Sequence, residues 1–230
     1  MSSIREKLLL SPLYDWFGKR SFAQSGEDII ADIELGKKKK GAYIDVGAFH
    51  PKLFSNTYLF YKRGWRGVCI EPRPEAKEAF EKVRPGDKFV GMGVGEKKDV
   101  LEYFEFADGA ANTFSAEQAE KNIKEAKRKL VRKINVAVMP LREILSNSGL
   151  ADKEIELMSV DVEGMDLEVL QSNDWKKFRP KLIICEDLDF DFRNPKQSGV
   201  VKYLMELKYR LVAKTPYSLI LVDSNLVKEK

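Results

Sequence analysis

The chain has 230 residues, 43% of them hydrophobic and 33% charged, a net charge of +4 and two cysteines. This composition is typical of one soluble globular domain that holds its core without disulfides or a structural metal. The small net charge argues against a nucleic-acid partner, and no segment has the length of a membrane span. Cys69 and Cys185 lie singly in apolar runs, and the amino terminus lacks the long apolar region of an export signal. We therefore expect a cytoplasmic protein.

Runs rich in Val and Ile alternate with helical patterns along the chain, which predicts an α/β fold. The predicted strands are 42–47, 67–71, 88–92, 134–138, 155–162, 181–186, 209–213 and 218–223. The predicted helices are 55–63, 74–83, 141–147 and 166–172. The strands are almost continuously apolar, as expected when both faces are buried, and a Thr-Pro turn separates the last two. We expect a doubly wound, mostly parallel seven-stranded sheet with an antiparallel C-terminal hairpin.

We expect a single domain over residues 1–230, with a helical segment at 1–30 and an insertion at about 99–133. The insertion begins with the alternation of a half-exposed strand and continues as a lysine-rich helix predicted over 117–133. Glu and Lys at helical spacing fit a solvated amphipathic helix. A second hypothesis is that its cations attract an anionic acceptor or an acidic membrane surface. These cations are Lys124, Lys127, Arg128, Arg132 and Lys133.

Two predicted strands end in an acidic residue. Asp45 closes the first run, with Gly47 after it, and Glu71 closes the second. Ligands of an open parallel sheet bind beyond the carboxyl ends of its strands, so both carboxylates are expected to face that crevice. Glu71 is then suited to accept hydrogen bonds from ribose hydroxyls, and Asp45 to bind an ammonium group. Gly47 lets the ligand approach the backbone closely.

The loop after the first strand separates two classes of cofactor. It reads Gly47-Ala48-Phe49-His50-Pro51 and lacks the GxGxxG pattern that cradles a pyrophosphate. Bulky Phe49 and rigid Pro51 make a poor pyrophosphate site, whereas a nucleoside without phosphates, such as S-adenosylmethionine, tolerates them. The loop favours methyl transfer over the alternative of a nucleotide-dependent oxidoreductase or epimerase.

The chain resembles the FkbM family of S-adenosylmethionine-dependent methyltransferases over roughly residues 21–190. The resemblance rests on successive blocks that occur in the family's order: "SFAQSGEDIIA", "YIDVGAFHP", "SNTYLFYKRGWRGVCIEPRP", "NTFS" and "LMSVDVEGMDLEVLQSNDWKKFRPKLIICED". It implies a Rossmann-like methyltransferase fold and O-methyl transfer to a hydroxyl of a sugar, glycan precursor or secondary metabolite. Many members have His where this chain has Met165.

The resemblance also implies which residues form the site. Asp161 and Glu163 belong to the "DVEG" block, which faces the point of methyl transfer in the family. The implied cofactor contacts are Gln24, Ser25, Glu27, Asp45, Gly47, Glu71, Gly93 and Val94.

A hydroxyl is a weak nucleophile, so the acceptor needs a general base or a metal ion. His50 is the only histidine, and its near-neutral pKa suits proton removal, although a loop histidine bonded to backbone explains it equally. Asp161 and Glu163 are the second candidates, either as a base or, joined by Glu186 and Asp187 at the next strand end, as a Mg²⁺ site.

Asn56 and Thr57 are candidates for the acceptor pocket, although a Ser-Asn-Thr run is also an ordinary helix start. The expected partner is a small-molecule or glycan acceptor. A different class of function is a non-catalytic module that keeps the nucleoside pocket for recognition.

Overall fold

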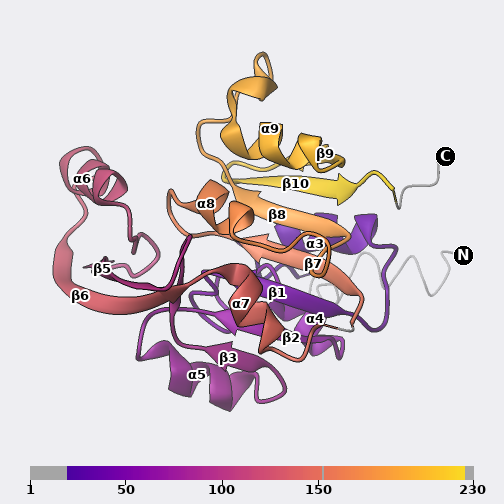
Figure 1. Ribbon diagram of the computed structural model, residues 1–230, viewed down its shortest axis with the longest axis horizontal. Coiled ribbons are helices and arrows are strands. Elements are labelled where there is room, and N and C mark those ends of the chain that lie inside the picture. The colour runs from indigo at the N-terminus through magenta and orange to yellow at the C-terminus, as the bar shows by residue number, and fades with distance from the viewer. Residues whose placement is uncertain (1–19, 152, 226–230) are drawn as a thin grey trace, which may run out of the picture.

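The computed structural model describes residues 20–151 and 153–225. Its centre is a seven-stranded sheet in the order β3-β2-β1-β7-β8-β10-β9 (Figure 1). Every pairing is parallel except those of β10, which is antiparallel to both β8 and β9. The expected sheet and its C-terminal hairpin are confirmed. The strands are β1 (Ala42–Val46), β2 (Arg66–Ile70), β3 (Lys88–Val90), β7 (Ile155–Val160), β8 (Leu182–Glu186), β9 (Tyr209–Lys214) and β10 (Ser218–Asp223).

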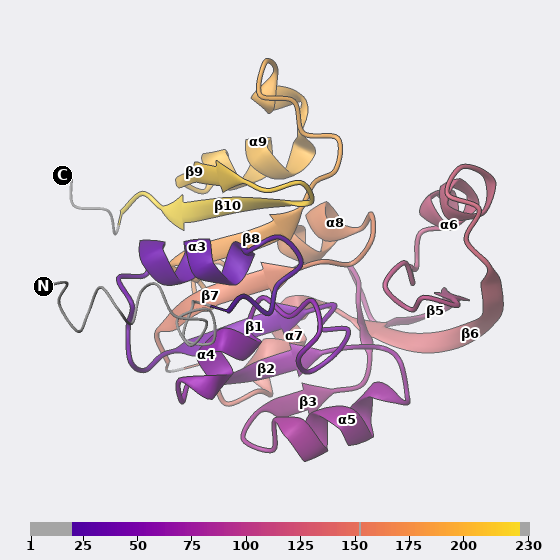
Figure 2. The same cartoon turned by 180° about the vertical axis from the view of Figure 1, so that it is seen from behind.

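Helices cover both faces of this sheet, one set in front in Figure 1 and the other in front in Figure 2. Tyr43 and Cys69 pack with α3, α4 and α5, whereas Ile44 and Val68 pack with α7, α8 and α9. Successive strand residues point to opposite faces, so β1 is buried along its whole length. The helices are α3 (Glu27–Glu34), α4 (Tyr58–Lys62), α5 (Ala76–Val83), α7 (Leu141–Ser146), α8 (Asp166–Gln171), the 3₁₀ turn η1 (Pro195–Gln197) and α9 (Gly199–Glu206).

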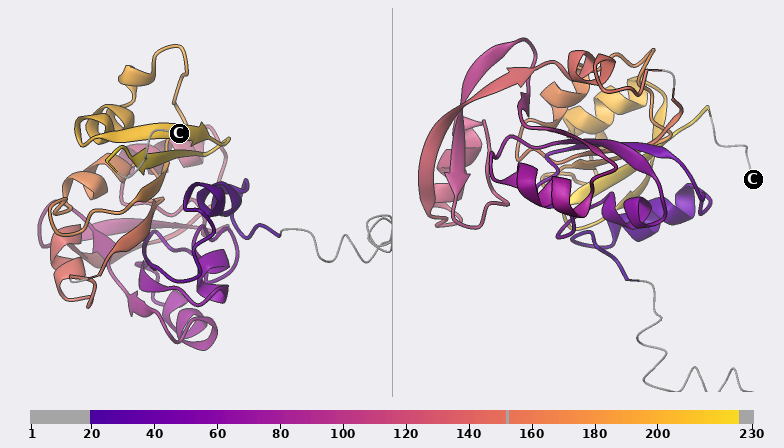
Figure 3. Two further views of the ribbon diagram at one scale, coloured as in Figure 1. Left: turned by 90° about the vertical axis from the view of Figure 1, so that its right-hand side faces the viewer. Right: turned by 90° about the horizontal axis from the view of Figure 1, so that it is seen from below.

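A second, three-stranded sheet stands beside the carboxyl ends of the main strands (Figure 3). It consists of β4 (Gly93–Val94), β6 (Leu130–Met139) and β5 (Asp99–Phe106), in that order. The strand predicted at 134–138 therefore belongs to this sheet and not to the main one. The reason is visible in its burial, since Val136 and Val138 are buried while Asn135 and Ala137 between them are exposed. A strand with one exposed face does not suit the interior of a doubly covered sheet.

The single helix expected over 117–133 is wrong. Helix α6 (Ala116–Lys124) ends early, Lys127 has a φ of 51°, and β6 begins at Leu130. Antiparallel pairing with β5 overrides the helical pattern, because it brings Arg132 opposite Glu105 and forms an ion pair between them. Lysines and glutamates satisfy a charged helix and a half-exposed strand equally well, so their spacing alone could not separate the two.

The expected helical segment at 1–30 is only partly covered, because residues 1–19 lie outside the described part of the chain. Residues 20–26 form no helix, and α3 begins at Glu27. Helix α9 was not predicted. Among the described residues, none of the helices combines the length and apolar character needed to cross a bilayer.

A buried arginine lies beneath the loops that follow β1. Arg84 is 1% exposed, and its Nε donates to Asp87 Oδ2 at 2.7 Å. Its Nη2 donates to Tyr43 Oη at 2.8 Å and Thr57 Oγ1 at 2.9 Å, and its Nη1 lies 3.8 Å from Asp45 Oδ2. The network joins β1 to the starts of α4 and the end of α5. Two buried carboxylates thus depend on one buried cation.

We expect Arg84→Ala to lower the free energy of unfolding by about 3–5 kcal/mol, because it leaves buried carboxylates without their cation. Chemical denaturation measures the change. Arg210→Ala is the matched control, since Arg210 is exposed on β9, and it should change stability by less than about 0.5 kcal/mol. Equal effects of the two substitutions would contradict a stabilising role for the network.

Candidate active site

A cavity of about 170 Å³ opens at the carboxyl ends of β1, β2, β7 and β8. Strand order reverses between β1 and β7, and open parallel sheets bind ligands at this point. The second sheet and the 109–114 segment close the opposite wall. The lining residues that follow or end main-sheet strands are Val46, Gly47, Ile70, Glu71, Asp161, Glu163 and Glu186.

The floor of the cavity is a close contact between the loops after β1 and β7. Asp161 N donates to Val46 O at 3.0 Å, and Gly47 has a φ of 72°. A Cβ atom added to Gly47 would lie 1.7 Å from the carbonyl oxygen of Asp161. Both the backbone angle and the lack of space require glycine here.

Glu71 ends β2 and lies on the cavity wall, almost fully buried. Its Oε2 accepts the Phe49 backbone N–H at 2.8 Å, and its Oε1 accepts the Arg73 backbone N–H and Nε, each at 3.0 Å. Arg73 also stacks over the Phe49 ring, 4.6 Å from its centroid. Burial raises the pKa of Glu71, and Arg73 opposes the shift. The carboxylate is therefore held in a fixed orientation at the strand end.

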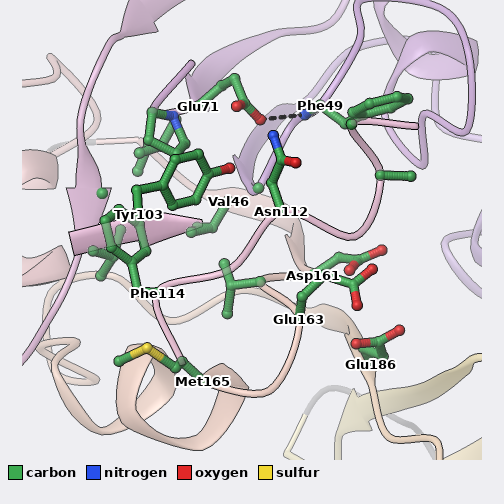
Figure 4. A pocket seen from close by; sticks show the side chains of 18 of the residues that line it. Val46, Phe49, Glu71, Tyr103, Asn112, Phe114, Asp161, Glu163, Met165 and Glu186 are labelled. Carbon is green, nitrogen blue, oxygen red and sulfur yellow. Dashed lines mark hydrogen bonds between the residues drawn. The ribbon is translucent and has the colours of Figure 1, made fainter. Parts of the chain in front are cut away.

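Three carboxyl groups converge on the opposite side of the cavity (Figure 4). They belong to Asp161, Glu163 and Glu186, and one oxygen from each lies within 4.8 Å of the others. Burial and neighbouring carboxylates raise the pKa of Asp161 to about 6, of Glu163 to about 8 and of Glu186 to about 10. Like charges this close disfavour simultaneous ionisation. The acidic cluster can take up a proton near neutral pH or hold a cation.

The remaining wall comes from the second sheet and its loops. Tyr103 and Phe114 pack with ring centroids 4.5 Å apart, and a Cβ on Gly93 would lie 2.5 Å from the Phe114 ring. Asn112 lies between Glu71 and the acidic cluster (Figure 4). Sequence analysis missed these aromatic and amide residues, because it treated their segment as an insertion over a sheet edge. The only available signal was the alternation that places Tyr103 on one face of a strand.

Comparison with protein families matches residues 45–211 to the FkbM methyltransferase domain. The match covers most of the chain, including all four strand ends that line the cavity. The chain belongs to the FkbM family of methyltransferases. Comparison with curated proteins finds no significant match.

Two solved structures are similar to this FkbM-family chain. The FkbM methyltransferase from Methylobacillus flagellatus KT shares 13% identity with a TM-score of 0.46, over 80% of this chain and 44% of that one. This chain thus spans less than half the length of that protein. A precorrin-6y C5,15-methyltransferase from Geobacter metallireducens GS-15 shares 13% identity with a TM-score of 0.42, over 90% and 93% of the two chains. At these scores neither neighbour informs the chemistry of the cavity.

The cavity brings together about half of the residues expected from the family resemblance. Met165, at the position where many members have His, also lines it. The expected residues that line the cavity are Gln24, Gly47, Glu71, Gly93, Val94, Asp161 and Glu163. Those that do not are Ser25, Glu27, Asp45, His50, Asn56, Thr57 and Asp187.

Asp45 points away from the cavity because of its place in β1. It shares a face with Tyr43, beneath α4 and α5, where it accepts the Thr57 hydroxyl and faces Arg84. Asn56 lies close by and donates to Ser159 Oγ at 3.0 Å. The contacts expected of Asp45 with a cofactor, and of Asn56 and Thr57 with an acceptor, are not made by these side chains in this conformation.

His50 folds back onto its own loop. Its Nδ1 accepts the backbone N–H groups of Lys52 at 3.1 Å and Leu53 at 2.9 Å, and burial together with Arg73 lowers its pKa. This is the arrangement of a loop histidine bonded to backbone. A catalytic role for His50 would need a rearrangement of residues 50–53.

The other expected residues outside the cavity have structural partners. Glu27 accepts the Ser25 backbone N–H at 2.8 Å and the Thr215 hydroxyl at 2.6 Å, which ties the start of α3 to the β9–β10 turn. Asp187 accepts the Ser198 hydroxyl at 2.5 Å and faces a neighbouring groove. Glu186, not Asp187, joins Asp161 and Glu163.

The raised pKa of Glu186 predicts a stability change with pH. The folded protein keeps a proton on Glu186 up to about pH 10, whereas the unfolded chain releases it near 4.5. The free energy of unfolding therefore falls as pH rises through this window. We expect Glu186→Gln to melt at least about 3 °C above the parent protein at pH 9 and to equal it at pH 4.5.

Thermal melting at the two pH values measures this difference. Glu78→Gln, on the exposed face of α5, is the matched control and should behave as the parent at both values. A parent protein more stable than Glu186→Gln at pH 9 would show that the carboxylate is ionised and stabilising.

Proposed function

We propose that this chain is an S-adenosylmethionine-dependent O-methyltransferase acting on a hydroxyl of a sugar, glycan precursor or secondary metabolite. The observation that carries the proposal is that one cavity contains both a carboxylate suited to ribose, Glu71, and proton-accepting carboxylates, Asp161 and Glu163. The free, buried thiols of Cys69 and Cys185 support a proposed cytoplasmic location.

The cavity fits the nucleoside part of this cofactor. Gly47 leaves room for a ligand against the backbone, and Glu71 can accept from two ribose hydroxyls once Arg73 yields one oxygen. Gly93 and Val94, with Phe114 behind them, offer an apolar wall for a purine ring. When bound, S-adenosylmethionine supplies an electrophilic methyl group on a sulfonium.

The acceptor hydroxyl must lose a proton as its oxygen attacks, and Asp161 is the residue proposed to take it. Its pKa of about 6 lies just below neutral pH, so it is mostly ionised yet still basic. Glu163, with a pKa of about 8, would remain mostly protonated at neutral pH and can donate a hydrogen bond to the acceptor. Positioning of the acceptor against the methyl group supplies much of the remaining rate.

A Mg²⁺ ion is proposed as a second occupant of the acidic cluster, held by Asp161, Glu163 and Glu186. Three carboxylate oxygens within 4.8 Å of one another suit a hard cation. A bound cation would supply the positive charge that keeps all three carboxylates ionised. Asp187, proposed from sequence as the third ligand, faces the neighbouring groove instead.

The other two functions receive less support from the site. An oxidoreductase or epimerase would need a pyrophosphate cradle, and the Phe49 backbone N–H that could contribute to one is already bonded to Glu71. A non-catalytic module would gain nothing from three converging carboxyl groups whose pKa values are raised by burial.

Calorimetric titration tests the nucleoside site. We expect S-adenosylmethionine and S-adenosylhomocysteine to bind, NAD not to bind, and Glu71→Ala to weaken both sulfur nucleosides by at least about 30-fold through the loss of charge-assisted hydrogen bonds. Glu78→Ala is the matched control, since it removes an exposed carboxylate on α5 and should leave the affinities unchanged. Preferential binding of NAD would overturn the proposal.

The role of Asp161 is tested by methyl transfer from radiolabelled S-adenosylmethionine to an acceptor found by screening sugars. Asp161→Asn should lower kcat by about 10²- to 10⁴-fold while changing cofactor affinity less than about 3-fold. The parent's kcat should rise with pH on a limb near 6, because the ionised carboxylate is the active form. A limb near 8 that Glu163→Gln abolishes would assign the base to Glu163 instead.

A further inference from the structure

A second concavity, of about 580 Å³, lies beside the cavity and is strongly acidic. It runs between the start of α8, the segment after β8 and the start of α9, and we call it the acidic groove. Among the described residues that line it, none is Lys, Arg or His. Its six carboxyl groups belong to Asp166, Glu168, Glu186, Asp187, Asp189 and Asp191.

Asp166 gives independent evidence for a missing partner. It is only 6% exposed, and its Oδ1 is buried without a hydrogen bond from any described residue. Backbone N–H groups of Gly164 and Glu186 act on the same carboxylate, so the side chain is anchored. A buried oxygen without a partner costs free energy. An ammonium group in the groove would donate to it.

Cations of the protein reach only the edges of this region. Arg193 pairs with Asp191, and Lys121 on α6 faces Asp189. Lys214, at the end of β9, faces Glu186 and Asp187, and Arg128 faces Glu163 from the cavity side. None of these items places a cation beside Asp166 or Glu168. The middle of the groove therefore has a surplus of negative charge.

The acidic groove and the cavity are continuous, because Glu186 and Leu188 line both. A molecule whose hydroxyl lies near Asp161 can therefore extend into the groove. We propose that the acceptor carries ammonium groups that bind there, which makes it an amino sugar or an oligosaccharide of amino sugars. This inference rests on the proposed function and adds the class of acceptor to it.

The opposite expectation, that basic residues at 124–133 attract an anionic acceptor, loses its basis in the structure. Arg128 pairs with Asp108, Lys124 with Glu120, and Lys133 with Glu102. Arg132 pairs with Glu105. Acidic partners neutralise these cations, whereas the acidic groove has no such compensation along its middle.

The test is calorimetric binding of two matched trisaccharides, the glucosamine trimer and its fully N-acetylated form. They carry the same ring hydroxyls and differ in whether the nitrogen is charged. Measurements use the full chain at pH 6.5, 50 mM salt and 1 mM EDTA, with S-adenosylhomocysteine present. The groove variant is Glu168→Gln/Asp189→Asn, and the control is Glu78→Gln/Glu81→Gln on α5, which changes the net charge equally.

We expect the glucosamine trimer to bind at least about 10-fold more tightly than its N-acetylated form. The groove variant should lose at least about 5-fold in affinity for the charged trimer, the control should lose less than 2-fold, and S-adenosylhomocysteine should bind all three proteins alike. Equal binding of the two trimers, or no binding of either, overturns the inference while an unchanged nucleoside affinity leaves the proposed function standing. Without EDTA, Mn²⁺ binding that the groove variant abolishes, with no preference for the charged trimer, would assign the groove to a metal ion.

Discussion

The contact between the β1 and β7 loops determines where everything else in the site can lie. Gly47 passes so close to the Asp161 carbonyl that a single added carbon would overlap it. The hydrogen bond from Asp161 N to Val46 O continues the β1–β7 pairing to the last residue before the loops diverge. Because strand order reverses at this junction, the two loops open onto the crevice from a shared floor. Glu71 on one side and the acidic cluster on the other are positioned relative to that floor.

The acidic cluster is costly for the fold. Burial raises the pKa of each of its carboxyl groups, which means that the ionised forms are destabilised in the folded chain. Glu163 also has a φ of 53°, a conformation that residues with a side chain rarely adopt. Arg84 compensates Asp45 and Asp87 beneath the floor, but no such buried arginine serves the cluster among the described residues. This arrangement suits a site that is completed by a proton, an acceptor or a cation.

Much of the fold could be predicted from sequence because nearly continuous apolar runs identify strands buried on both faces. The same logic placed Glu71 and Asp161 correctly, since each directly follows a strand. It could not place Asp45, which precedes the last strand residue and so points to the opposite face beneath α4. Nor could it place Tyr103 and Phe114, whose approach to the cavity depends on how the second sheet packs. The helix expected at 117–133 failed for a related reason, since the partner strand β5 is distant in sequence from β6.

The most direct test of the account is a crystal structure of the full chain with S-adenosylhomocysteine. We predict that both ribose hydroxyls bind Glu71, that the purine ring lies against Gly93 and Val94, and that the sulfur faces Asp161. Density for the nucleoside elsewhere, or a ribose that does not contact Glu71, would contradict the assignment of the cavity as a methyltransferase active site.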